Sequence, residues 1–232
     1  MLKVYQLDLQ AEICATHLAL LSIEEQSIIE KYRQPLLKQR QLAVRIWLRK
    51  ILAKQLMYSA KQLRFAKTDE GKPYLIDFPE IAFNLSHSDH IMLLAISDIG
   101  EVGIDIEFPK LAPRNFAAIV NKCFSISEQF YWQNLAESEK IAEFYRFWTA
   151  KEAFVKAVGR GLALGLENCI IAIDKPLRFE QLPAIYKPVQ QWRLWNLTLS
   201  IPAYAALVIR DHPQITLINQ IPIHIIDEFS SI

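Results

Sequence analysis

Alternating apolar and polar positions, the pattern typical of a half-buried β-strand, recur along the chain. At the start, apolar side chains at Leu2, Val4, Leu7 and Leu9 predict a first strand over 2–9. Short apolar or alternating runs predict further strands at 63–65, 91–96, 102–107, 170–173, 195–201, 204–209, 215–218 and 223–226. Prolines separate many of them, and no fixed-period repeat supports a solenoid.

Between the first strands the periodicity becomes helical. Ser22, followed by Glu24 and Glu25, predicts a helix start, and Pro35 should end that helix before a longer one over 36–57. One side of the longer helix is apolar. The other side is basic and carries Lys38, Arg40, Arg45 and Arg49. This face is either a solvated surface or a local phosphate-binding patch.

A third helix, predicted over 139–158, combines helical periodicity with charges that a plain surface helix does not need. Trp148, Glu152 and Lys156 fall at i, i+4 and i+8, so the carboxylate and the ammonium project from one side. Gly159 and Gly161 follow where the chain leaves the helical state. The pair is either an ordinary surface ion pair or a functional pair fixed on a rigid element.

The run VGIDIE at 102–107 is the most informative strand. Its alternation places Asp105 and Glu107 about 7 Å apart on one face. Two carboxylates side by side repel unless a cation lies opposite, and oxygen-only ligands with open positions match Mg²⁺. The alternative is an edge strand that uses charge for solubility.

Two turns carry polar groups. Residues 69–74 form a turn that presents Lys72 between a glycine and a proline, although such a loop can be only a hairpin connection. Residues 83–90, FNLSHSDH, predict a loop with Ser86 and His87 between two strand-like segments. A single histidine is more often structural than catalytic.

Pro109 and Pro113 make 108–114 the best candidate for a linker, which divides the chain into halves at 1–107 and 108–232. After a helix over 115–123, residues 125–128 match the S-x-x-E capping box, which locally explains Glu128 without any catalytic role. In that case Glu128→Gln should be mild in both stability and rate.

The composition excludes several classes of protein. Of 232 residues, 26 are Lys or Arg and 25 are Asp or Glu, so the chain is nearly neutral. It has no overall positive charge that would predict binding to nucleic acid or to an anionic membrane. No apolar run approaches the ~20 residues that span a bilayer. The three cysteines show no disulfide or zinc spacing. We therefore expect a soluble cytoplasmic protein.

Read together, four motifs in order resemble the 4′-phosphopantetheinyl transferases of the surfactin-synthetase type. They are G-K-P at 71–73, S-H-S at 86–88, G-I-D-I-E at 103–107 and W-x-x-K-E-x-x-x-K at 148–156. The resemblance covers residues 63 to about 166 and is far more specific than any single motif. It implies an enzyme that moves the phosphopantetheine arm of coenzyme A to a serine of an acyl or peptidyl carrier protein and releases 3′,5′-ADP.

The resemblance also implies roles and a fold. Asp105, Glu107 and Glu152 match ligands of Mg²⁺, and Glu152 matches the base. Residues matching the coenzyme A contacts are Arg40, Lys72, Ser86, His87, Lys151 and Lys156. Lys156 and, by its place in the family, Glu128 match catalytic positions. The implied fold is α+β (mixed α/β), with two similar halves about a pseudo-two-fold axis, each a small, mainly antiparallel sheet packed with helices.

One departure concerns residues 24–29, EEQSII, where members of the family often have lysines that clamp the 3′-phosphate. That clamp then depends more on Arg40 and His87. A non-catalytic coenzyme A or carrier-protein binding module of the same fold is the alternative, although such decay should first remove metal ligands, and all are present. A chain that completes its own cleft is expected to be a monomer.

Overall fold

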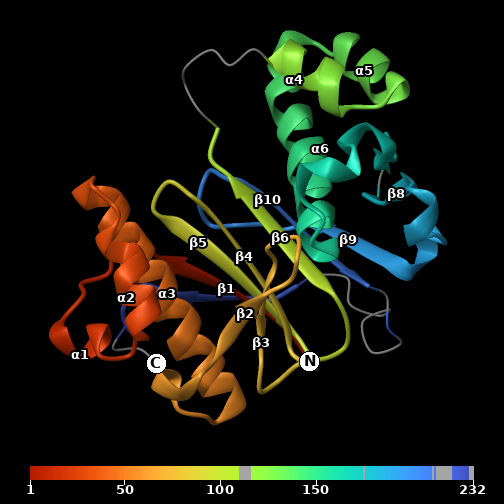
Figure 1. Cartoon of the computed structure of the whole chain (residues 1–232). Coiled ribbons are helices and arrows are strands. Elements are labelled where there is room, and N and C mark those ends of the chain that lie inside the picture. Colours follow the sequence, from red (N-terminus) through yellow and green to blue (C-terminus); the bar gives the residue numbers. More distant parts are fainter. Residues whose placement is uncertain (110–115, 175, 211, 213–220, 230–232) are drawn as a thin grey trace.

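The computed structural model describes residues 1–109, 116–174, 176–210, 212 and 221–229. It is an α+β fold in which two groups of helices flank the strands on opposite sides (Figure 1). Within the described residues, no helix is long and apolar enough to cross a membrane.

The first sheet has the strand order β11-β1-β5-β4. Its strands are β1 (Leu2–Asp8), β4 (Ala82–Ser88), β5 (Ile91–Ser97) and β11 (Ile223–Ile226). The β1–β5 and β4–β5 pairs are antiparallel, whereas β11 returns from the far end of the chain to pair parallel with β1. The C-terminal segment therefore completes the N-terminal sheet.

Helix α3 (Pro35–Leu56) packs its apolar stripe against the first sheet. Trp47 is fully buried there, and its Nε1 donates to the Asp8 carbonyl at 2.7 Å. Alternation in β5 directs Met92, Leu94 and Ile96 towards this helix. The shorter helices on this side are α1 (Ala15–Leu18), α2 (Ile23–Glu30) and the 3₁₀ turn η1 (Ala60–Gln62).

The second sheet has the order β6-β10-β9 and is fully antiparallel. Its strands are β6 (Val102–Glu107), β9 (Trp192–Asn196) and β10 (Tyr204–Arg210). Helix α6 (Glu137–Val158) crosses β6 and β10 at close range because Gly103 has no side chain. A Cβ at Gly103 would lie 2.0 Å from the Ala153 carbonyl oxygen and 2.3 Å from the Ala157 nitrogen.

Gly103→Ala is therefore expected to lower the free energy of unfolding by about 3 kcal/mol, because the added methyl meets helix backbone that cannot rotate away. Urea unfolding followed by circular dichroism measures the loss. Gly161→Ala is the control: its Cβ would meet nothing within 4 Å, and it should cost only the ~1 kcal/mol of a left-handed alanine. Equal losses in the two variants would contradict the close approach of α6 to β6.

The remaining elements are two hairpins and short helices. They are β2 (Phe65–Lys67), β3 (Pro73–Leu75), α4 (Phe116–Cys123), α5 (Ile126–Gln133), η2 (Gly161–Leu164), η3 (Leu166–Asn168), β7 (Ile170–Ile171), β8 (Phe179–Gln181), η4 (Ala184–Tyr186) and η5 (Val189–Gln191). Strands β2 and β3 pair, as do β7 and β8. The G-K-P turn is thus part of a hairpin connection.

Two helix-packed cores are joined by a third between the sheets. Alternation in β10 sends Ala206 and Val208 towards α6, and sends Leu207 and Ile209 to the opposite face. That opposite face packs with Leu93 and other residues of β1, β5 and β6. Strand β6 also lies along β4. The predicted boundary at 107/108 stays a prediction, and most of the predicted linker lies outside the described residues.

Most predicted elements are confirmed, with four exceptions. The strand predicted at 63–65 lies two residues too early, because β2 spans Phe65–Lys67. The predicted loop at 83–90 is wrong, because β4 continues to Ser88 and its polar side chains face β6 rather than water. The predicted strand at 195–201 is wrong in its bounds: β9 spans Trp192–Asn196, since the chain must turn back before β10. The predicted strand at 170–173 ends at Ile171. The strand predicted at 215–218 lies outside the described residues.

Candidate active site

A lysine, an aspartate and a serine meet where α6 crosses β6. Lys156 Nζ lies 2.6 Å from Asp105 Oδ1 and 2.8 Å from Ser86 Oγ, and Ser86 Oγ donates to the same Asp105 oxygen at 2.8 Å. Asp105 is only 3% exposed. Although β6 lies at an edge of the second sheet, a side chain that buried does not serve solubility, so the interpretation of Asp105 as a solubility device is wrong.

Alternate polar residues on β4 bring β6 into place. Asn84 Oδ1 accepts a hydrogen bond from the Ile104 nitrogen at 2.9 Å, and Ser88 Oγ accepts one from the Phe108 nitrogen at 3.1 Å. Ser86 lies between them and faces Asp105. The i, i+2, i+4 spacing puts all three side chains on one face of the strand. They link the two sheets through side chains rather than a backbone ladder.

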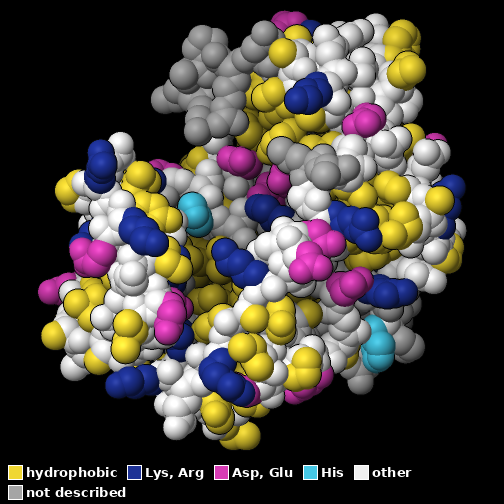
Figure 2. All heavy atoms as spheres, viewed as in Figure 1, with side chains coloured by type: hydrophobic (Ala, Val, Ile, Leu, Met, Phe, Trp, Pro, Cys, Tyr) yellow, Lys and Arg dark blue, Asp and Glu magenta, His cyan; other side chains and the backbone are white. Residues whose placement is uncertain are grey.

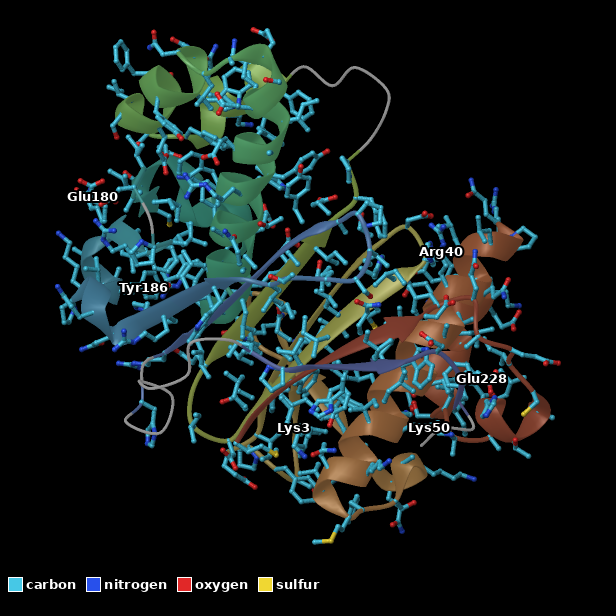
Figure 3. The ribbon with its side chains drawn as sticks, turned by 180° about the vertical axis from the view of Figure 1, so that it is seen from behind. Lys3, Arg40, Lys50, Glu180, Tyr186 and Glu228 are labelled. Atoms are coloured by element: carbon cyan, nitrogen blue, oxygen red, sulfur yellow. The ribbon has the colours of Figure 1, made fainter. Side chains whose placement is uncertain are left out.

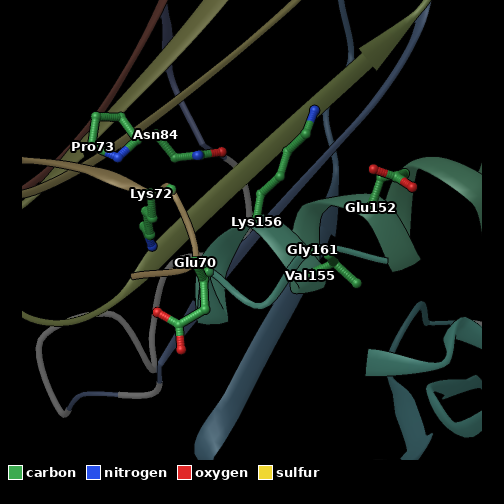
Figure 4. Close-up of a pocket in the computed structure, with 10 residues that line it drawn as sticks. Glu70, Lys72, Pro73, Asn84, Glu152, Val155, Lys156 and Gly161 are labelled. Atoms are coloured by element: carbon green, nitrogen blue, oxygen red, sulfur yellow. The ribbon is translucent and has the colours of Figure 1, made fainter. Parts of the chain in front are cut away.

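Glu152 and Glu107 complete the acidic side of the site. Glu152 projects from the same side of α6 as Lys156 (Figure 4). Burial raises its pKa first, the neighbouring charges of Asp105 and Glu107 raise it further, and Lys156 opposes them. Ser88 Oγ donates to Glu107 Oε2 at 3.3 Å. Burial also raises the pKa of Asp105, against the pull of Lys156.

A pocket of about 250 Å³ opens beside Glu152 and Lys156. It lies between α6 and the β2–β3 hairpin, and Asn84 and Lys72 also line it (Figure 4). Both halves of the chain therefore contribute walls. Figure 2 shows acidic, basic and histidine side chains gathered around a hollow between the N-terminal helices and the C-terminal half.

Lys72 caps the end of α6. Its Nζ donates to the Ala157 carbonyl at 2.5 Å and to the Val102 carbonyl at 3.3 Å. An ammonium at a helix C-terminus interacts favourably with the unpaired carbonyls and the helix dipole. Burial lowers the pKa of Lys72 to about 8, with Glu101 opposing. The lysine thus lines the pocket with its stem while its charge joins β6 to α6.

Arg40 belongs to α3 and His87 to β4, and the charges of both Arg40 and Lys156 act on His87. Arg40 Nη2 donates to Asp89 Oδ1 at 3.1 Å, and the guanidinium is half-buried on α3. The pKa of His87 is lowered by partial desolvation and then by the positive charges of Lys156 and Arg40. Although the imidazole has an exposed edge, its neutral form is therefore favoured, and this form can accept one hydrogen bond and donate another.

Two predicted site residues lie elsewhere. Glu128 and Lys151 are both 0% exposed and form an ion pair, with Lys151 Nζ 2.9 Å from Glu128 Oε2. Lys151 Nζ also donates to the carbonyls of Leu166 (2.9 Å) and Cys169 (2.6 Å). Burial lowers the pKa of Lys151, and Glu128 opposes this. With its donors all engaged, Lys151 does not face the pocket.

The predicted capping box at Glu128 is confirmed. Glu128 Oε2 accepts from the Ser125 nitrogen at 2.7 Å, and Ser125 Oγ accepts from the Glu128 nitrogen. The other oxygen, Oε1, accepts from the Ile171 nitrogen at 2.8 Å. Glu128 is therefore more than a cap, because it ties α5 to β7 and, through Lys151, to α6. This placement speaks against a catalytic role for Glu128 and a phosphate contact for Lys151.

The donor set fits a hard cation in one specific respect. Asp105 Oδ2 is buried and has no hydrogen-bond partner in the described structure. An orphaned carboxylate oxygen beside further carboxylates suits Mg²⁺, which takes oxygen ligands. As the side chains stand, no three His, Cys, Asp or Glu of the described residues form a group that could hold a metal ion. In this structure the positive charge of Lys156 pairs with Asp105.

Comparison with known proteins matches both halves to one family. Residues 101–209 match the model of the 4′-phosphopantetheinyl transferase superfamily, and residues 10–98 match that of the 4′-phosphopantetheinyl transferase N-terminal domain. The Nostoc protein HetI, a 4′-phosphopantetheinyl transferase, is 32% identical over 82% of this chain and 79% of its own length. The chain belongs to this superfamily.

Other relatives agree. The Synechocystis protein slr0495, provisionally named as a 4′-phosphopantetheinyl transferase, is 36% identical over 76% of this chain and 71% of its own. The 4′-phosphopantetheinyl transferase Sfp of Bacillus subtilis is 29% identical over 72% of each chain. The resemblance drawn from the four motifs is confirmed, and the chain is an enzyme of the phosphopantetheinyl transferase class.

Sequence reasoning missed two residues of this transferase site. Asn84 and Ser88 hold β6 at the distance where Ser86 reaches Asp105. Their signal was present as N-x-S-x-S at 84–88, an alternation of polar residues. This segment is easily taken for a loop. Its alternating polar side chains belong in a buried strand only because the polar groups of β6 lie opposite them.

Glu152→Gln is expected to stabilise the metal-free transferase at pH 7. A carboxyl whose folded pKa is raised contributes stability below its unfolded pKa and loses it as the pH rises through the folded value. The Gln variant avoids that loss, so its melting temperature should exceed the parent's at pH 7 and match it below about pH 4. Glu180→Gln, at an exposed position (Figure 3), should show no such difference. If the melting temperature of Glu152→Gln at pH 7 is lower than the parent's, Glu152 is not buried close to Asp105 and Glu107.

Proposed function

We propose that this transferase moves the 4′-phosphopantetheine arm of coenzyme A to a serine of an apo acyl or peptidyl carrier protein, with Mg²⁺, and releases 3′,5′-ADP. The observation that carries the proposal is that Lys156 contacts both Ser86 and Asp105 and also lines one pocket together with Glu152. Breaking a pyrophosphate ester requires charge neutralisation and an aligned nucleophile. This pocket brings carboxylates, an ammonium and a polar wall together for that purpose.

Asp105, Glu107 and Glu152 would hold the metal, which when bound neutralises oxygen charge on the pyrophosphate. The unpartnered Asp105 Oδ2 is the oxygen most in need of such a partner. Lys156 has a second task. Its ammonium is held by Asp105 and Ser86, and its side chain, which is 29% exposed and lines the pocket, is within reach of an anionic ligand there. It would stabilise negative charge that develops on the transferred phosphoryl group.

Glu152 is the proposed base for the serine hydroxyl, directly or through water. A general base works best when its pKa approaches the operating pH, and burial together with Asp105 and Glu107 raises the pKa of Glu152 in that direction. The rigid helix α6 fixes its position relative to Lys156, four residues later. The carboxylate can then accept a proton while Lys156 faces the phosphates.

We assign the adenine and 3′-phosphate end of coenzyme A to Arg40, Lys72, Ser86 and His87. The resemblance implies lysines for this clamp in the stretch 24–29, where this chain instead has Glu25, which caps α2 and pairs with the buried Arg49 at 2.8 Å. Because this segment stabilises the fold, we assign the binding of the 3′-phosphate to Arg40 and His87. Arg40 can exchange Asp89 for a phosphate, a bidentate partner of higher charge.

Arg40→Ala is expected to raise KM for coenzyme A more than it lowers kcat, because the contact exists before and during the reaction. It should also discriminate poorly between coenzyme A and dephospho-coenzyme A. Arg45→Ala is the matched control, since Arg45 lies on the same helix and donates instead to Gln41. If Arg40→Ala keeps the parent's preference for coenzyme A, the 3′-phosphate assignment is wrong.

A non-catalytic coenzyme A or carrier-binding module is the less favoured function, because binding alone needs neither Glu152 nor an orphaned Asp105 oxygen. We further propose that the enzyme acts as a monomer, since one chain supplies both walls of the pocket. Its three free cysteines favour a reducing compartment such as the cytoplasm.

Intact mass spectrometry tests the proposal. A panel of apo carrier proteins from fatty-acid, polyketide and peptide synthesis is incubated with enzyme, coenzyme A and Mg²⁺. The proposal predicts a mass gain equal to the phosphopantetheine arm on at least one carrier, and its loss with EDTA or when the carrier serine is replaced by Ala. Unmodified carriers throughout, with coenzyme A bound, would favour the binding module instead.

A further inference from the structure

Asn84, on β4, is a buried side chain of which only one amide atom has a partner. The residue is 7% exposed, and its Oδ1 accepts a hydrogen bond from the Ile104 nitrogen at 2.9 Å. Among the described residues, no hydrogen bond uses its Nδ2. An amide nitrogen can donate two hydrogen bonds, and a buried polar group normally has at least one partner. The structural role of Asn84 in holding β6 therefore leaves half of its amide unexplained.

The unpartnered nitrogen lies at the transferase pocket. Asn84 lines this pocket together with Glu152 and Lys156. Unlike Asp105 Oδ2, this nitrogen is not fully buried, so it keeps an accessible side. Figure 4 shows the amide reaching from β4 towards the Lys156 side chain on α6. A ligand in the pocket can therefore reach Nδ2.

The contact with β6 fixes which amide atom is available to a ligand. The Ile104 nitrogen can only donate, so it selects the oxygen of the Asn84 amide as its partner. The reversed amide would bring two donors face to face at a buried position. The group that faces the ligand is thus an N–H donor, held in place before any ligand arrives, and its partner must be an acceptor atom.

Phosphoryl oxygens are the acceptors that best fit this position. Ser86, two residues after Asn84 on the same face of β4, contacts Lys156 Nζ at 2.8 Å. Side chains at this spacing stand about 7 Å apart, so the amide nitrogen and the ammonium flank a space that one phosphoryl group can bridge. Hydrogen bonds to charged oxygens are roughly twice as strong as those between neutral groups.

The other charges of the pocket favour a neutral donor at this place. Lys72 Nζ already donates to the Ala157 and Val102 carbonyls, and Lys156 is paired with Asp105. A further cation beside these carboxylates would pair with them, as Lys156 does. An amide donor cannot form an ion pair, so it stays available to oxygens whose negative charge grows during the reaction.

We propose that Asn84 Nδ2 donates a hydrogen bond to an oxygen of the transferred phosphoryl group, in addition to holding β6 through Oδ1. This inference rests on the proposed transferase function and adds a neutral donor to the ammonium of Lys156. Because the Ile104 nitrogen fixes the amide, the donor needs no reorganisation when charge develops on the phosphoryl oxygens.

Two substitutions of similar shape separate the ligand contact from the structural contact. Asn84→Asp keeps an oxygen that accepts from the Ile104 nitrogen but loses the donor, whereas Asn84→Leu loses both. The proposal predicts that kcat/KM for coenzyme A falls about a hundredfold in both variants, the usual effect of removing one preorganised donor. If Asn84 only holds β6, Asn84→Asp should keep the parent's rate. If only an added negative charge matters, Asn84→Leu should keep it. Either of these two patterns would overturn the proposal.

Urea unfolding followed by circular dichroism shows that each preparation is folded. Asn84→Leu should unfold at a lower urea concentration than Asn84→Asp, because it leaves the Ile104 nitrogen without an acceptor. Asn84→Ala, the smaller neutral variant, takes the place of Asn84→Leu if the latter does not fold. Asn134→Asp is the control for the added charge, since Asn134 is exposed at the end of α5 and should keep the parent's rate.

Calorimetric titration with 3′,5′-ADP, which lacks the transferred phosphoryl group, tests which part of coenzyme A meets the amide. The neutral variant should bind 3′,5′-ADP as tightly as the parent does. A loss of 3′,5′-ADP affinity as large as the loss in kcat/KM would place Asn84 at the nucleotide and overturn the proposal. A parent that binds coenzyme A but modifies no carrier protein would overturn the transferase function as well, whereas a parent that transfers no faster than its variants would overturn this inference alone.

Discussion

Lys151→Met should lower the free energy of unfolding by about 3–5 kcal/mol, although Lys151 stands within the family motif. The substitution keeps the shape of the side chain and removes its charge. The carboxyl group of Glu128 then lies at 0% exposure without its ion-pair partner, and the carbonyls of Leu166 and Cys169 lose a donor. At ~2–4 °C per kcal/mol for a chain of this size, the melting temperature should fall by roughly 6–20 °C.

A double-mutant cycle distinguishes this structural role from a catalytic one. Glu128→Gln alone should also be strongly destabilising, because it leaves the ammonium of Lys151 buried and unpaired. The double variant Glu128→Gln/Lys151→Met should lose less than the sum of the single losses, since no unpaired charge remains. If the Glu128→Gln variant is fully stable but slow, Glu128 has a catalytic role. If its stability and its rate both change little, Glu128 acts only as a helix cap.

Asp105→Asn should reduce transfer by a hundredfold or more while the chain stays folded. Losing one charge-stabilising group from a preorganised site typically costs ~3 kcal/mol in the transition state. Stability should survive, because burial raises the pKa of Asp105 and the ionised form is therefore the costly one at neutral pH. The amide oxygen of Asn can still accept from Lys156 and Ser86.

Steady-state transfer kinetics and urea unfolding of the same preparations check both parts of this prediction. Asp174→Asn is the control, because Asp174 is exposed, pairs with Arg178 and lies far along the chain from the site. It should keep the parent's rate. An Asp105→Asn variant that retains the parent's transfer rate would exclude Asp105 from the chemistry.

The core of the site could be predicted from the sequence, because the repeat of two residues in a strand and of 3.6 residues in a helix determines which side chains share a face. Asp105 and Lys156 were each assigned from local spacing, and Gly103 in the same strand lets α6 approach closely enough to join them. The motif alone does not separate Lys151 from Lys156. The helical period does, since Lys151 is turned about 100° from Glu152, whereas Lys156 lies one turn beyond it.

Other features depend on contacts between distant segments. Glu128 matches a capping box locally, but its partners Lys151 and Ile171 lie 23 and 43 residues away, and no local pattern announces them. The S-H-S segment is a strand because its polar face meets β6, which only the packing of the sheets reveals. Likewise β11 joins the first sheet through a parallel pairing across more than 200 residues.

The central claim is that Asp105, Glu107 and Glu152 form a metal-dependent transfer site, and ligand-dependent thermal unfolding tests it most directly. Binding to the folded state adds ~2.7 kcal/mol at a hundredfold excess over Kd, so saturating Mg²⁺ with coenzyme A should raise the melting temperature of the parent by roughly 5–11 °C. The additional rise due to Mg²⁺, over coenzyme A alone, should shrink sharply in Asp105→Asn. A full Mg²⁺-dependent rise in that variant, together with undiminished transfer, would contradict the account.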